Sequence, residues 1–279
     1  MKTILVPVDF TDVSKNAARF ALRLATDLNC GKVIFYNAYE TPIPQNTDPM
    51  GIVSGPFTMY DAREFKQISE AGLAQLKHEI TTDEPSSAIP IETVSEYGGM
   101  TPLEIDEICK KLGVDLIVTA TGDDGFLDET GIDTVNLAKS TTIPVLAVPA
   151  ECNFKPLKNI MLACDLKKVT ETIPFDAIDA ILSATQAKFS ILHIQENENE
   201  VVLENEKQAL DKKFEPYQPE FHDVKNADFM EAIHSFATEN DINLIITIPK
   251  KHGWLEGLFK TSHLKKLAFH SHIPLLIIH

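Results

Sequence analysis

The eleven residues TGDDGFLDETG, Thr121 to Gly131, combine three glycines with four carboxylates and follow the apolar run VDLIV. A glycine-rich turn after a strand is a common way to bind phosphate, because its backbone amides can approach the anion closely. Several acids within ~6 Å of a phosphate repel it unless a cation joins them. The chemistry to test is therefore phosphate binding, either lost or assisted by a divalent metal such as Mg²⁺.

The elements that must position this loop occur twice along the chain. The stretch KTILVPVDF, residues 2–10, matches KNIMLACDL 156 positions later, and residues 32–38 match a second stretch at the same offset. The later segments VDLIVT and TIPVLAV match INLIIT and HIPLLII at offsets of 128 and 130. Four segments in the same order predict two homologous domains, 1–150 and 151–279, the second about 28 residues shorter in its middle.

Within each copy, short apolar runs alternate with amphipathic helical stretches. Runs such as ILVPV and DLIVTA are nearly continuous in apolar residues, as strands buried on both faces are. A helix with Ser14 as its N-cap follows the first run. Another begins at Thr101 with a capping box to Glu104 and ends at Gly113. This alternation predicts α/β domains, each with a five-stranded parallel sheet and helices on both faces.

Composition and charge narrow the class of protein. The formal net charge is −16 over 279 residues, which disfavours binding to nucleic acid. No window holds the ~18 apolar residues of a membrane span, and the start MKTILVPVDF reaches a proline and an acid too soon for a secretory signal. The four cysteines form no C-x-x-C pair. These features predict a cytoplasmic protein without a structural metal or disulfide framework.

The motifs ILVPVDFTDVSKNAARFALRLA, GVDLIVTATG and IPVLAVP together resemble the universal stress protein family, in a tandem form. The resemblance implies flavodoxin-like, Rossmann-like domains with the first strand central. It also implies that the last strands of the two domains pair, here 145–148 against 275–278. Such pairing has a physical reason, because an unpaired apolar edge strand promotes aggregation. Some members bind ATP or AMP and others bind no nucleotide.

The resemblance also names candidate binding residues. Strand-end positions that flank adenine and ribose in nucleotide-binding members correspond here to Pro7, Val8, Asp9 and Ala38. Asp9 lies where strand order reverses, the usual ligand position in open α/β sheets. The alternative is that Asp9 only caps the following turn.

The family's phosphate loop reads G-x-x-G, nine residues, then G-S or G-T. Gly122 and Gly125 match the first pair and Gly131 the third glycine, but only five residues lie between Gly125 and Gly131. Ile132 stands where a hydroxyl residue is expected. The loop is therefore degenerate.

The corresponding loop of the second copy, residues 249–263, is basic instead of acidic. Its glycines do not fit the pattern, but Ser262 is near the expected phosphate serine and precedes a helical stretch. This loop could bind an anion, or it could be a solvated surface or a cationic patch against the acidic loop.

The second copy also holds eight of the nine histidines, at spacings that match no familiar metal motif.

No Walker, G-x-S-x-G or H-E-x-x-H motif is present, so catalysis has little support. The sequence favours a stress-response regulatory or binding protein with degenerate nucleotide loops and an unidentified protein partner. The alternatives are an adenine-nucleotide sensor using ATP or AMP with Mg²⁺, or a slow nucleotide hydrolase. Whether the chain also forms a homodimer is left open.

Overall fold

The computed structural model describes residues 1–41, 61–84, 87–121, 134–195, 204–225, 229–248 and 272–278. In both halves strands and helices alternate as predicted. The first half contains β1 (Thr3–Pro7), α1 (Asp12–Asp27), β2 (Lys32–Tyr39), α2 (Ala62–Asp83), β3 (Ile91–Tyr97), α3 (Pro102–Leu112), β4 (Leu116–Thr121), α4 (Thr134–Ser140) and β5 (Val145–Pro149). The second half contains β6 (Asn159–Ala163), α5 (Val169–Thr172), α6 (Phe175–Thr185), β7 (Lys188–Gln195), α7 (Glu204–Phe214), the 3-10 turn η1 (Glu215–Tyr217), β8 (Glu220–Lys225), α8 (Phe229–Glu239), β9 (Leu244–Thr247) and β10 (Leu275–Ile277).

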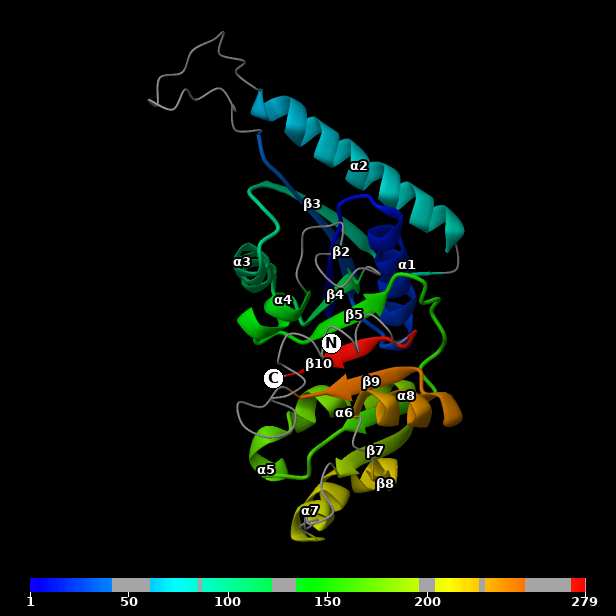
Figure 1. Cartoon of the computed structure of the whole chain (residues 1–279). Coiled ribbons are helices and arrows are strands. Elements are labelled where there is room, and N and C mark those ends of the chain that lie inside the picture. Colours follow the sequence, from blue (N-terminus) through cyan, green and yellow to red (C-terminus); the bar gives the residue numbers. More distant parts are fainter. Residues whose placement is uncertain are drawn as a thin grey trace, which may run out of the picture.

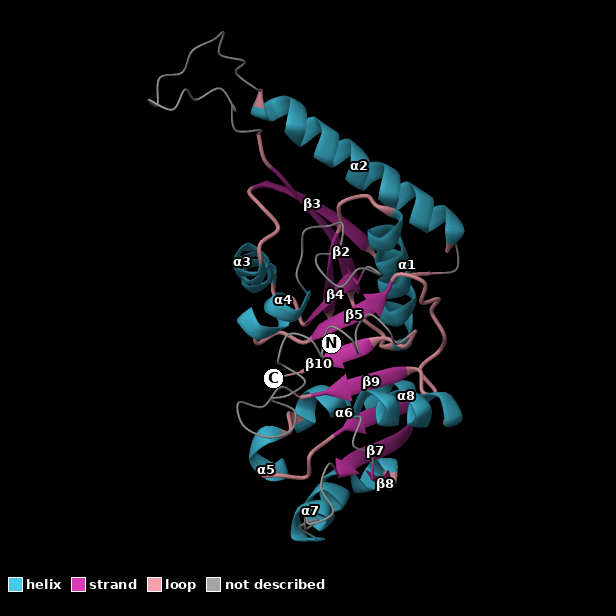
Figure 2. Ribbon diagram, in the orientation of Figure 1, coloured by secondary structure: helices cyan, strands magenta, loops and turns pink. Residues whose placement is uncertain are grey.

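The ten strands form one continuous sheet in the order β3-β2-β1-β4-β5-β10-β9-β6-β7-β8. Each half contributes five parallel strands, and the halves meet where β5 and β10 pair antiparallel. The register places Leu276 opposite Leu146 and Ile277 opposite Val145. The predicted pairing of the last strands is therefore confirmed, and the sheet runs without interruption through the molecule (Figure 2).

Helices cover both faces of this sheet across both halves. One apolar cluster joins buried side chains of α1, α2, α6 and α7 to every second residue of the strands. A second cluster joins those of α3, α4 and α8 to the intervening residues. Strand side chains alternate between the two faces of the sheet. The register of the β5–β10 pair places residues of the same cluster opposite one another, so each apolar cluster continues from one half into the other. Figure 1 shows α2 near the β3 end of the sheet and α7 near the β8 end.

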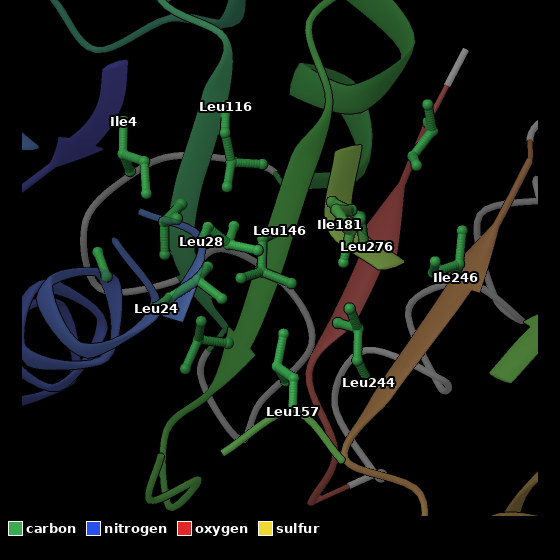
Figure 3. Close-up of a cluster of buried hydrophobic side chains, with 14 of the residues drawn as sticks. Ile4, Leu24, Leu28, Leu116, Leu146, Leu157, Ile181, Leu244, Ile246 and Leu276 are labelled. Carbon is green, nitrogen blue, oxygen red and sulfur yellow. The ribbon is translucent and has the colours of Figure 1, made fainter. Parts of the chain in front are cut away.

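The joint between the halves is packed with leucine and isoleucine side chains. Leu146 of β5 and Leu276 of β10 lie between residues of α1 and Ile181 of α6 (Figure 3). A small apolar cavity of about 10 Å³ remains there. Because its lining is apolar and offers a water molecule no hydrogen-bond partner, such a small space stays dry.

The observed helix cap agrees with the sequence prediction in α3 and differs from it in α1. Thr101 and Glu104 form the predicted capping box at the start of α3, and Gly113 ends that helix with a φ of 65°. The predicted N-cap Ser14 is wrong, because α1 begins three residues earlier than that cap implies and its N-cap is Thr11, which accepts from the Ser14 amide. The cause is the turn at Asp9 to Thr11, described below.

None of the helices in the described residues is both long and apolar enough to cross a bilayer.

Replacing Leu276 by alanine tests the joint. Leu276 is 2% exposed and borders the cavity between the halves, so the substitution enlarges an existing void. We expect a loss of about 2–5 kcal/mol in the free energy of unfolding, measured by urea denaturation followed by circular dichroism. Leu103→Ala is the control, because Leu103 is 68% exposed and its truncation should change stability by under about 0.5 kcal/mol. A loss below about 1 kcal/mol for Leu276→Ala would contradict tight packing at the joint.

The cysteines give a second prediction. All four are buried thiols outside any disulfide, and burial raises the pKa of Cys109 to about 12 and that of Cys152 to about 11. Because the thiolate is the reactive form, native protein at pH 8 should resist a thiol reagent, whereas urea-unfolded protein should release four reactive thiols. Rapid labelling of the native chain would show that the thiols are accessible.

Candidate functional site

The strand order of the first half reverses between β1 and β4, whose carboxyl ends lie at one edge of the sheet. Pro7, the last residue of β1, pairs with Tyr36 on β2, and Val8 and Asp9 follow directly. Ala38 lies near the carboxyl end of β2, paired with Glu96 of β3. The fold therefore brings Pro7, Val8, Asp9 and Ala38 to the same edge, where ligands bind in open α/β sheets.

Asp9 caps the turn that leads into α1. Its Oδ1 accepts from the Thr11 amide at 3.0 Å and from Thr11 Oγ1 at 2.7 Å. The intervening Phe10 has a φ of 71°, a left-handed conformation that this aspartate turn supports. The structure therefore contains the capping interaction of Asp9, and its contact with a nucleotide stays a prediction. Both of its hydrogen bonds use Oδ1, which leaves Oδ2 out of the turn.

Val8 has both of its backbone polar groups bound within the protein. Its amide donates to the Tyr36 carbonyl at 2.8 Å, as parallel strands require. Its carbonyl accepts from the Asn37 side-chain amide at 2.6 Å. The Val8 amide is therefore already engaged, and its carbonyl already accepts one hydrogen bond.

Asn37 anchors a buried neutral network that sequence reasoning missed. Its Oδ1 accepts from Ser69 Oγ on α2 at 2.6 Å, and Ser69 Oγ lies 2.7 Å from Ser95 Oγ on β3. Because the Ser69 proton is directed to Asn37, Ser95 is the donor of the second bond. The network ties β1, β2, α2 and β3 together behind the candidate site.

Hydroxyl groups border the same edge on the β4 side. Thr134, the first residue of α4, places its Oγ1 3.4 Å from the Ala120 carbonyl, and Thr121 Oγ1 lies 3.4 Å from the Val148 carbonyl. These threonines flank the acidic loop at its two ends. Gly122, Gly125 and Gly131 of that loop, and Ser262 of the basic loop, lie outside the described residues, so their proposed roles stay predictions.

The second half repeats the turn but changes the network. Asp165 stands 156 positions after Asp9 and its Oδ1 accepts from the Lys167 amide at 3.1 Å, with Leu166 at a φ of 48°. His193 stands 156 positions after Asn37, and its Nδ1 lies 3.2 Å from Asp223 Oδ1 on β8.

The same Asp223 carboxylate lies 3.4 Å from Lys207 Nζ on α7. A neutral amide and two serines in the first half are thus replaced by three ionisable groups. Among the described residues, no group of three or more acids, histidines and cysteines could bind a metal ion.

Comparison with known proteins identifies the family. The model of the universal stress protein family matches residues 1–149 and again 157–279. A search of curated protein sequences found no match.

Solved structures of the family cover both halves of the chain. A universal stress protein from Archaeoglobus fulgidus is 13% identical, with a TM-score of 0.67 over 99% of this chain and 95% of its own. A putative universal stress protein from Pseudomonas aeruginosa is 12% identical, with a TM-score of 0.56 over 100% of this chain and 93% of its own. A universal stress protein in complex with cAMP is 20% identical, with a TM-score of 0.37 over 53% of this chain and 96% of its own.

At these identities the likeness of the solved structures shows the α/β fold. The family model extends over nearly the whole chain in two successive matches. The first match contains β1 to β5, and the second contains β6 to β10. The chain therefore belongs to the universal stress protein family, in its tandem two-domain form.

Proposed function

We propose that this chain is a cytoplasmic regulatory protein of the stress response that acts by binding a protein partner and works without a nucleotide. The observation that carries the proposal is the closure of the candidate edge by the protein's own hydrogen bonds. The Val8 carbonyl is bound by Asn37 and the Asp9 Oδ1 by Thr11. An adenine nucleotide that displaced either of these bonds would leave a polar group without its partner, which costs about 1–3 kcal/mol.

Charge supports the same proposal. The loop that would approach phosphate carries four carboxylates, and the whole chain has a net charge of −16. Both features repel a polyphosphate unless cations intervene. The shortened glycine spacing and Ile132 in place of a hydroxyl residue further weaken the case for a working phosphate loop.

An enzymatic role receives less support than binding. Hydrolysis of a nucleotide needs a base aligned with an attacking water. Asp9, the carboxylate at the end of β1, uses Oδ1 to hold the turn into α1. The proposed functional units are the domains 1–150 and 151–279, which would bind the protein partner through their surfaces.

The second candidate is an adenine-nucleotide sensor, ATP or AMP with Mg²⁺, at the edge of the first domain. It is favoured by Asp9 Oδ2, which takes no part in the turn and would accept from a ribose hydroxyl. Ala38 would contact the base through its backbone, and the Thr134 hydroxyl would contact phosphate. In the second domain Ser262 and the lysines of the basic loop would bind an anion.

Calorimetric titration of ATP and of AMP into the purified chain, with and without Mg²⁺, separates the two candidates. We expect no binding in the micromolar range under any of these conditions. Micromolar binding that requires Mg²⁺ and is lost in Asp9→Ala would overturn the proposal in favour of the sensor.

Micromolar binding without Mg²⁺ would also overturn it and would indicate the basic loop. Lys250→Glu combined with Lys251→Glu should then abolish the binding, because two cations of that loop are reversed. Asp9→Ala is the matched control, since it leaves the second domain unchanged.

A further inference from the structure

A second cavity lies at the joint between the domains, at the same edge of the first domain's sheet as the candidate site but beyond the carboxyl end of β5. Its volume is about 50 Å³, compared with about 10 Å³ for the apolar cavity. A space of this size has room for several waters or one small oxyanion. Its lining comes from α1, from the segment between β5 and β6, and from the residues before β9 and β10: Phe20, Cys152, Asn153, Lys155, Ile242, Asn243, His272, Ile273 and Pro274.

The cavity exists because the domains pair antiparallel. That pairing brings the carboxyl end of β5 next to the amino ends of β9 and β10, as Figure 1 shows. The Asn16 side-chain amide on α1 fixes the connecting segment by donating to the carbonyls of Ala150 and Cys152 at 3.1 and 3.0 Å. Phe20 packs edge-on against Phe154 with ring centroids 5.0 Å apart. Both domains therefore shape the cavity.

The charged and titratable groups in the lining are basic, apart from the buried Cys152 thiol. Lys155 and His272 are both exposed, so their side chains can reach an ion at the mouth. The Lys155 charge acts on the Cys152 thiol and partly opposes the burial that raises its pKa to about 11. None of the nine lining residues is acidic. In a chain with a net charge of −16, this is a local basic site.

The amino edges of the two domains differ in charge at equivalent positions. Asp115, before β4, accepts from the amides of Lys2 and Thr3 through Oδ2 at 2.6 and 3.0 Å. Asn243, 128 positions later, accepts from the amides of Lys158 and Asn159 through Oδ1 at 3.0 and 3.1 Å. The backbone role is the same, but the negative charge has been removed.

The neighbouring position changes in the same direction. Thr142 precedes β5 in the first domain, and His272 stands 130 positions later, before β10. Lys155 belongs to the segment between the two domains. Asn243 in place of an aspartate therefore removes a negative charge, Lys155 adds a positive one, and His272 adds an imidazole that is positive when protonated.

We propose that this cavity binds one small oxyanion of the size and charge of inorganic phosphate or sulfate. Lys155 and His272 would neutralise its charge, and the side-chain amide of Asn153 would donate a hydrogen bond. Because the cavity is built from both domains and their connecting segment, bound anion stabilises the paired arrangement.

The test is a titration with inorganic phosphate, followed by amide chemical shifts in nuclear magnetic resonance at constant ionic strength set with chloride. We expect residues 152–155 and 272–274 to shift with one common millimolar Kd. Asn243→Asp should weaken the Kd by about tenfold or more, because it places a carboxylate beside the anion. The carboxylate can still accept from the two amides, as Asp115 does in the first domain.

Asp115→Asn is the matched control, because it makes the reciprocal change at the equivalent position of the first domain and should leave the Kd within about twofold. Lys155→Ala combined with His272→Thr should abolish binding, and it disturbs none of the Asn243 hydrogen bonds should Asn243→Asp fold poorly. A parallel titration with sulfate decides whether the site takes tetrahedral oxyanions in general. Equal phosphate affinity in the original chain and the double variant, or no shift at residues 272–274, would overturn the proposal.

Discussion

The antiparallel pair of β5 and β10 is the contact on which the rest of the molecule depends. Without it each domain would expose an apolar strand, and both strands are fully buried in the structure. With it, Leu146 faces Leu276 across the joint, and two apolar clusters run through both halves. Because the joint uses these two edges within one chain, a homodimer would have to form through another surface.

The two domains satisfy the same backbone requirements with different chemistry. Behind β1, a neutral amide and two serines connect the strands to α2, whereas behind β6 His193 and Asp223 take the places of Asn37 and Ser95, with Lys207 of α7 beside Asp223. At the opposite edge, Asp115 and Asn243 accept the same pair of amides, one with a charge and one without. The hydrogen bonds to the two backbone amides are thus the same in both domains, while the charge of the accepting side chain differs. Two domains of the same fold can therefore have surfaces of different charge.

Much of the fold could be predicted, because buried parallel strands have nearly continuous apolar runs and the repeat offsets align them. The capping box at Thr101 could be predicted equally well, since its two residues, Thr101 and Glu104, lie within four positions of the sequence. Ser14 was a wrong prediction because the left-handed Phe10 and the Asp9 turn, which place the cap at Thr11, leave little signal in sequence.

The candidate site was only partly predictable for a related reason. The edge holding Pro7, Val8, Asp9 and Ala38 follows from topology, and the structure places all four there. The Asn37 network depends on Ser69 and Ser95, which are brought to Asn37 only by the register of β3 and the packing of α2. A polar residue within an apolar run carries no sign of such distant partners, although its alignment with His193 marks a position where the two copies differ.

Native-state hydrogen exchange at the joint tests the central claim that the two domains form one sheet with shared cores. The amides of β5 and β10 that bond across the pair should exchange with the same free energy as those in the centres of β1 and β6, and with the same dependence on denaturant. Exchange of the β5–β10 amides at a clearly lower free energy, while β1 and β6 stay protected, would contradict the claim. It would mean that the domains separate before either one unfolds.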